Sequence, residues 1–136
     1  ENARRHGVAD QIQFVQADLL SCFALHRQFA LVVSNPPYVS RLSLEQELEP
    51  EVADHEPHLA LDGGADGLDM IRAIARDLPS ILAPRGHLFM EFGADQGAAV
   101  RALFILEHEW ERRGGQVGIF QDYSGHDRVL HLQAQE

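Results

Sequence analysis

Hydrophobic and polar residues alternate in short runs along this chain, and these runs predict strands separated by helices. One run alternates Ile12, Phe14 and Val15 with glutamines, which is the period of a strand with one buried face. Another is a continuous apolar run that stops abruptly at Asn35, as expected of a strand buried on both faces. The predicted strands are residues 11–17, 29–34, 87–92, 116–121 and 128–133.

Helical spacing appears between these strands. Apolar residues recur near every third or fourth position over residues 68–82, and the sequence Pro84-Arg85-Gly86 ends that helix. A second helix is predicted at residues 95–108 after Gly93. Two shorter helical segments and a loop complete the prediction: a polar helix end at residues 1–7 with Gly7 as its C-cap, a short helix or ordered loop at 42–54, and a shaped aspartate- and glycine-rich loop at 56–67.

The order of these elements predicts an α/β fold. Strands that alternate with helices form a doubly wound sheet, and the last two strands, joined by the turn at residues 122–127, add an antiparallel pair. Trp110 lies between the second helix and this hairpin, where we expect it to anchor packing.

Composition narrows the class of protein. With 136 residues, 45% of them hydrophobic, the chain reads as one soluble globular unit, and the lack of a long apolar run or a basic leader predicts a cytoplasmic protein without a membrane span. The net charge of −10 argues against broad contact with nucleic acid. Cys22, the single cysteine, is expected to be a packing residue. The eight histidines are expected at the surface, and Pro57 between His55 and His58 argues against a helical metal pair, so no metal site is predicted.

The sequence Asn35-Pro36-Pro37-Tyr38, the Asn-Pro-Pro-Tyr loop, is the strongest candidate site. Ligands of open α/β sheets bind beyond the carboxyl ends of strands, and two prolines hold such a loop rigid. The Asn35 side-chain oxygen and the Pro36 carbonyl offer two acceptors beside the flat ring of Tyr38, which suits a planar NH2 group. Taken alone, the four residues are more often an ordinary turn. The surrounding segments favour the functional interpretation.

An ordered set of segments is spread along nearly the whole chain: residues 32–39, 56–57, 60–61, 63–68, 91–93, Gln96 and 122–129. This set resembles the HemK/PrmC family of class I S-adenosylmethionine-dependent methyltransferases, which modify a glutamine side-chain nitrogen in peptide-chain release factors. Adenine-amine methyltransferases would share loops like Asn-Pro-Pro-Tyr but not the segments at residues 63–67 and 127–129.

The resemblance implies roles for particular residues. Asn35, Pro36, Pro37 and Tyr38 would hold the acceptor amide, and Asp18, Leu19 and Asn35 would contact the S-adenosylmethionine cofactor. For Asp18, a helix N-cap is the alternative role, compatible with the first. The family's recognition domain and its first two strands, with the Gly-rich turn, have no counterpart here. Residues 1–136 are therefore expected to be the C-terminal portion of a single catalytic domain, with an incomplete Rossmann-like fold.

Three functions stay open at this point. The first is protein-glutamine methylation with a release factor as partner; the second is N6-adenine methylation of nucleic acid; the third is a catalytically silent fragment that binds no cofactor. The missing strands would also leave sheet edges open, which predicts either a separate segment that supplies the missing half or a homodimer. The sequence Gly114-Gly115-Gln116 reproduces the tripeptide that the family methylates, but a turn entering a strand explains it better than self-methylation does.

Overall fold

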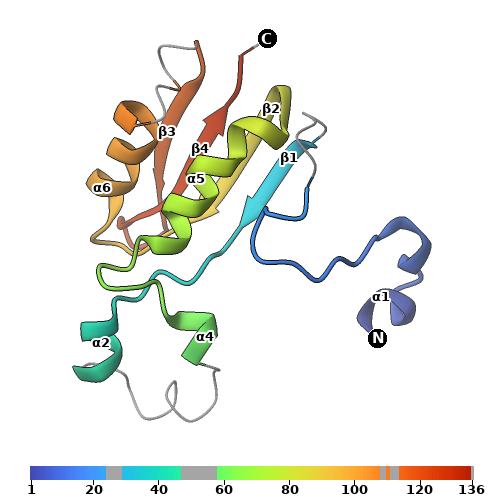
Figure 1. Cartoon of the computed structure of the whole chain (residues 1–136), viewed down its shortest axis with the longest axis horizontal. Helices are drawn as coiled ribbons and strands as arrows, with labels where there is room; N and C mark the ends of the chain where they lie inside the picture. The colour runs from blue at the N-terminus through green and yellow to red at the C-terminus, as the bar shows by residue number, and fades with distance from the viewer. Residues whose placement is uncertain (24–28, 47–57, 108–109, 111–113, 136) are drawn as a thin grey trace.

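The computed structural model describes residues 1–23, 29–46, 58–107, 110 and 114–135, and its centre is a four-stranded mixed sheet (Figure 1). The strand order is β1-β2-β4-β3. β1 and β2 are parallel, whereas β4 is antiparallel to both β2 and β3. This arrangement confirms the predicted α/β class with a closing antiparallel pair. The strands are β1 (Phe29–Ser34), β2 (Leu82–Glu91), β3 (Gln116–Gln121) and β4 (Asp127–Gln133).

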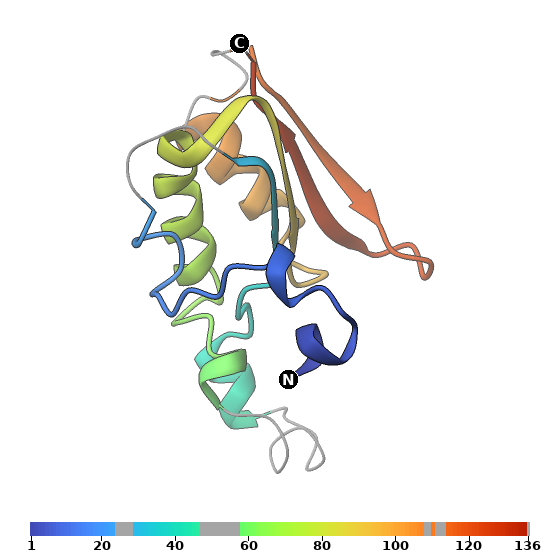
Figure 2. The ribbon, with the colours of Figure 1, turned by 90° about the vertical axis from the view of Figure 1, so that its right-hand side faces the viewer.

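Two helices cover one face of this sheet (Figure 2). α5 (Asp69–Ile81) matches the predicted helix to within one residue at each end. α6 (Gly97–Ala102) continues into a π-helical turn, η2 (Leu103–Glu107), so the predicted second helix is confirmed as far as the structure describes it. The short helices are α1 (Asn2–Arg5), the 3-10 turn η1 (Ala9–Gln11), α2 (Arg41–Gln46) and α4 (His58–Leu61).

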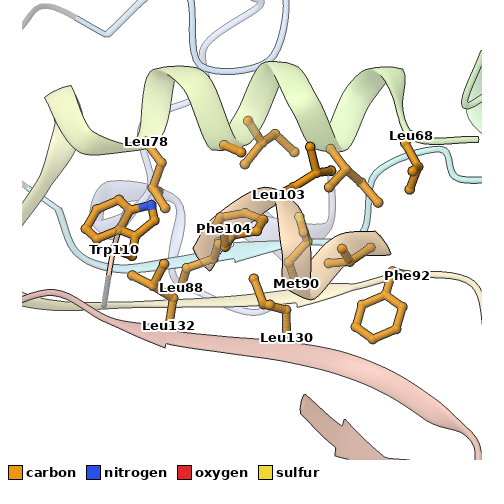
Figure 3. Packing of buried hydrophobic residues seen from close by; sticks show 14 of the residues in the cluster. Leu68, Leu78, Leu88, Met90, Phe92, Leu103, Phe104, Trp110, Leu130 and Leu132 are labelled. Carbon is orange, nitrogen blue, oxygen red and sulfur yellow. The ribbon is translucent and has the colours of Figure 1, made fainter. Parts of the chain in front are cut away.

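The hydrophobic core lies between these helices and the sheet (Figure 3). α5 buries one face because its apolar residues recur at helical spacing, while β2 and β4 bury alternate residues. Trp110 is 6% exposed and packs against this cluster, which confirms its predicted role. Fully buried members include Ile71, Leu78, Leu88, Met90, Phe92, Phe104, Leu130 and Leu132.

The opposite face of the sheet carries exposed apolar side chains. Val33 in β1 is 72% exposed and Phe120 in β3 is 54% exposed. Leu31 in β1 and Phe89 in β2 are exposed as well. β1 is also an edge strand of the described sheet. These features agree with the predicted open edge, while the homodimer stays a prediction.

The predicted strand at residues 11–17 is wrong. In the structure η1 ends at Gln11 and the following residues have no regular structure, with Phe14 78% and Val15 59% exposed. A strand needs a neighbour to pair its N–H and C=O groups, and no strand in the described ranges lies beside this segment. The alternating pattern is present, but the pairing partner is not.

Two boundaries also differ from the prediction. β2 begins at Leu82 instead of residue 87, because Leu82 pairs with Phe29 across a register shift in β1. Residues 58–61, expected within a loop, form the single turn α4. α2 confirms the start of the segment predicted at 42–54, whose later part lies outside the described residues. β3 begins at Gln116, as expected of a turn that enters a strand.

Several side chains are placed differently from the sequence interpretation. Cys22 is exposed, so its expected packing role is wrong. His87 and His131 are half-buried on neighbouring strands, with their ring nitrogens Nδ1 and Nε2 2.9 Å apart, because the β2–β4 register brings the two rings together. His6 and His126 are exposed as predicted. His26, His55 and His108 lie outside the described residues, as does Pro57, and the His58 side chain is likewise not described. Among the described helices, none is long and apolar enough to cross a membrane.

Asp66 stabilises the start of α5 and gives the fold a testable pH dependence. Its carboxylate accepts hydrogen bonds from the Leu68 backbone N–H at 3.1 Å and from Arg72, and mainly the Arg72 guanidinium lowers the pKa of Asp66 to about 2. A lowered pKa adds stability that is complete above the usual value of 3.8 and disappears as the pH falls through 2.

We therefore expect Asp66→Asn to melt below the wild type at neutral pH, with a gap that closes as the pH falls from about 4 to about 2. Because both side chains are about half exposed, the difference should be small. Thermal melts followed by circular dichroism at each pH measure it, and a gap that persists unchanged at the acid end would contradict the assignment.

Candidate active site around the Asn-Pro-Pro-Tyr loop

The Asn-Pro-Pro-Tyr loop leaves the carboxyl end of β1, next to the end of the parallel strand β2, where Ser34 pairs with Met90. Asn35 is exposed, Pro36 is buried, and Tyr38 is half-buried. All four residues of the loop line one cavity of about 290 Å³, together with Val39, Ala60 and Leu61. The four residues that the sequence interpretation singled out therefore line one cavity, and their roles there stay a prediction.

Tyr38 is held through its hydroxyl group as well as by its place in the loop. The hydroxyl donates to Glu91 Oε1 at 3.1 Å, at the end of β2. Partial burial and this hydrogen bond raise the pKa of Tyr38, so the side chain stays a neutral phenol at physiological pH. The hydroxyl is therefore directed at Glu91, while the half-buried side chain packs against the hydrophobic core.

We expect Tyr38→Phe to lower kcat by less than about tenfold, because the variant keeps the ring and loses one hydrogen bond to Glu91. The raised pKa also predicts that activity shows no titration of Tyr38 up to about pH 10. Steady-state rates of both proteins across pH measure this. A loss as deep as that of an acceptor variant would assign the hydroxyl a direct part in the reaction.

A loop before α5 packs against the Asn-Pro-Pro-Tyr loop. We call this loop, residues 62–67 with the sequence Asp-Gly-Gly-Ala-Asp-Gly, the glycine loop. The Val39 N–H donates to Leu61 O at 3.0 Å, and the Gly63 N–H donates to Val39 O at 2.9 Å, so the two segments run side by side (Figure 1). A β-carbon at Gly63 would lie 2.8 Å from the Tyr38 Cα, and one at Gly67 would overlap the Tyr38 carbonyl oxygen. The glycines therefore permit a close backbone approach that other residues would block.

The start of β4, next to the hairpin turn, contributes Arg128 to the same region. Asp122 accepts hydrogen bonds from the Ser124 and His126 backbone N–H groups, and its carboxylate lies 3.6 Å from Arg128 Nε. These contacts, the backbone bonds first, lower the pKa of Asp122. Arg128 also donates to the Phe92 carbonyl at 3.2 Å. Arg128, Tyr38 and Gln96 line a second cavity of about 300 Å³ with Ser40, Ser43, Asp66 and residues 93–95.

Asp18 and Leu19 are not brought to this site. Asp18 is exposed and its backbone carbonyl accepts from Ser21 in a turn, so no described helix begins there and the N-cap role is not seen. Leu19 has a φ of 46° and packs against the core beside Leu20. Neither residue lines the cavity next to Asn35. Residues 11–17 lie outside the sheet, so Asp18 does not follow a strand as the resemblance implies.

The cavity next to Asn35 is lined by the four residues of the loop and by three apolar residues. The cavity at the Asn-Pro-Pro-Tyr loop includes no acid and no glycine-rich turn of the kind that binds a nucleoside and its charged tail. No group of three or more histidine, cysteine, aspartate or glutamate side chains in the described part has the arrangement of a metal site.

Comparisons with known proteins found a family model, several sequence relatives and a solved structure. A family described as "RMKL-like, methyltransferase domain" matches residues 1–51. The chain is 42% identical over 133 residues to the release factor glutamine methyltransferase of Thermosynechococcus vestitus, covering 97% of this chain and 44% of that protein. It is 41% identical over 131 residues to the protein of the same name from Cereibacter sphaeroides, covering 96% of this chain and 44% of that protein.

A solved structure of the same kind is also similar. It is a release-factor-specific protein-(glutamine-N5) methyltransferase from Alicyclobacillus acidocaldarius, 22% identical, with a TM-score of 0.48, covering 79% of this chain and 82% of that one. The assignment rests on the sequence relatives. The chain spans less than half the length of the curated relatives it matches best here.

Proposed function

Because this chain belongs to the release factor glutamine methyltransferase family, we propose that the whole protein methylates the side-chain amide nitrogen of a glutamine in a peptide-chain release factor. The methyl donor in this proposal is S-adenosylmethionine, the cofactor that the family resemblance implies. The observation that carries the proposal is the arrangement of the Asn-Pro-Pro-Tyr loop. Its four residues, which carry the two proposed acceptors and the aromatic ring, line one cavity beyond the end of β1.

The two acceptors are available for a substrate. Among the hydrogen bonds of the described residues, none occupies the Asn35 side chain or the Pro36 carbonyl. A glutamine amide has two N–H groups on one planar nitrogen, and these two acceptors can receive both. Tyr38 would lie along the amide plane, with its own hydroxyl kept away by Glu91.

This arrangement addresses the chemical difficulty of the reaction. An amide nitrogen is a weak nucleophile because its lone pair is delocalised into the carbonyl group. Two acceptors on its N–H groups fix the direction of the nitrogen and stabilise the positive charge that develops on it as a new bond forms. The rigid prolines reduce the entropy that the loop loses when the substrate binds. Positioning, with proton loss after transfer, is therefore the main contribution of these residues.

The cofactor roles of Asp18 and Leu19 remain predictions for the whole protein. They require residues 11–17 to join the sheet as a strand, which would bring Asp18 to the same edge as Asn35. Isothermal titration of this chain with S-adenosylmethionine tests whether it binds cofactor without further segments. Absence of binding to this chain, with binding to the full-length protein, would match the proposal that this piece alone is silent.

The proposal is tested by offering two substrates to the full-length protein with radiolabelled S-adenosylmethionine: a release factor and an adenine-containing DNA duplex. Label in the release factor alone is the expected result. Label in the DNA alone would replace the proposal with adenine methylation, since an exocyclic amine also presents two N–H groups to the loop. The net charge of −10 favours the protein substrate.

A further inference from the structure

Gln96, the N-cap residue of α6, makes three hydrogen bonds with its side-chain amide and joins three separate segments. Its Oε1 accepts from the Gly93 backbone N–H at 2.9 Å. Its Nε2 donates to the Tyr38 carbonyl at 2.9 Å and to the Gly67 carbonyl at 3.3 Å. The side chain therefore connects the end of β2, the Asn-Pro-Pro-Tyr loop and the glycine loop.

Only a glutamine amide fits this set of partners. The site needs one acceptor facing a backbone N–H and one NH2 group facing two carbonyl oxygens, which is the full capacity of the amide for donors. A glutamate of the same shape would keep the bond from Gly93 but would direct a carboxylate oxygen at the Tyr38 and Gly67 carbonyls. A methionine of similar length would lose all three bonds and leave those carbonyls without this donor.

These bonds fix Tyr38 at two points. Gln96 holds its backbone carbonyl, and Glu91 holds its hydroxyl, so neither the main chain nor the ring of Tyr38 is free to shift. Pro36 and Pro37 have fixed φ angles, so fewer backbone torsions can absorb a displacement of Tyr38 before it reaches Asn35. The direction of the two acceptor groups is therefore set in part by a residue that does not touch the cavity next to Asn35.

We propose that Gln96 is a positioning residue for methyl transfer, which sets the geometry of the Asn35 and Pro36 acceptors through the Tyr38 carbonyl. This inference rests on the proposed function. A shift of about 1 Å in a positioned group costs about a hundredfold in rate. The effect should fall on kcat, because Gln96 acts on orientation and does not line the cavity next to Asn35.

The test uses the full-length protein with Gln96→Glu and Gln96→Met, and Gln116→Glu as the matched control on the exposed side of β3. Both Gln96 variants should lower kcat about a hundredfold while the KM for the release factor and the affinity for S-adenosylmethionine stay within about threefold. The control should match the wild type. Rates are normalised to folded protein by the melting curve, so a purely structural role, with lower melting temperature but normal kcat per folded molecule, would overturn the inference.

A second measurement separates this inference from the proposed function. Amide hydrogen exchange at Val39 and Gly63 measures how often the backbone hydrogen bonds between the two segments open, and it needs no substrate. We expect exchange there to be about tenfold faster in Gln96→Glu than in Gln116→Glu. Unchanged exchange would overturn the positioning role, whatever the wild type methylates. A wild type that leaves release factors unmodified would instead refute the proposed function while the exchange result still stands.

Discussion

Asn35→Ala in the full-length protein should reduce methyl transfer to the release factor by at least about a thousandfold, the largest effect we expect from a single change. The variant removes one of the two acceptors that we propose for the amide nitrogen, and in that proposal Pro36 alone cannot hold both N–H groups. Affinity for S-adenosylmethionine should stay within about tenfold of the wild type. Single-turnover rates and isothermal titration measure the two quantities separately.

The stability of this variant supplies its control. Asn35 is exposed, so the free energy of unfolding should change by no more than about 0.5 kcal/mol. Asn2→Ala, also at an exposed asparagine, should leave both activity and stability unchanged. Retained turnover in Asn35→Ala would refute the assignment of the acceptor, and a collapse of stability would show that Asn35 has a structural part.

Gly67→Ala should produce the second largest effect, on stability and activity together. Gly67 has a φ of 78°, and a β-carbon there would overlap the Tyr38 carbonyl oxygen and lie 2.5 Å from Gln96 Nε2. The positive φ costs about 1–2 kcal/mol and the overlap about 1–3 kcal/mol more. Because the relief of this overlap moves Tyr38, kcat should fall about a hundredfold. Denaturant unfolding and steady-state rates measure the two effects.

Gly125→Ala separates the two causes. Gly125 has a φ of 83°, but a β-carbon there would meet nothing within 4 Å. The variant should therefore lose only the about 1–2 kcal/mol that the backbone angle costs, with normal kcat. An equal loss of unfolding free energy in Gly67→Ala and Gly125→Ala would mean that the close approach of the glycine loop to Tyr38 does not contribute to stability.

Local patterns were enough to predict much of this fold. The apolar run at residues 29–34 pairs with β2, the helical spacing of α5 buries one face of that helix, and the alternation in β3 and β4 matches an antiparallel pair. Residues 11–17 have an equally clear pattern, but a strand forms only beside a partner, and none of the described strands pairs with them. The alternating pattern predicts a tendency to form a strand, and the presence of a neighbouring strand determines whether the strand forms.

Of the candidate site, too, only one part could be predicted from the sequence. The Asn-Pro-Pro-Tyr loop is a contiguous motif, so its chemistry follows from four neighbouring residues. The residues that hold Tyr38 could not be predicted in this way, because Glu91 and Gln96 lie 53 and 58 positions away in the sequence. They come close to Tyr38 only through the β1–β2 pairing and the turn after β2. Both residues lie in segments that match the family, but the sequence alone does not show which groups they bind. Their hydrogen bonds in the structure identify these groups.

The most direct test of the central claim is the position of the methyl group. The full-length protein is incubated with S-adenosylmethionine and a release factor, and the digested release factor is analysed by tandem mass spectrometry, with the Asn35→Ala protein in parallel. The account predicts one added methyl group on the side-chain nitrogen of the glutamine in a Gly-Gly-Gln sequence, and none with the variant. A methyl group on another residue, or an equally modified peptide from the Asn35→Ala reaction, would contradict it.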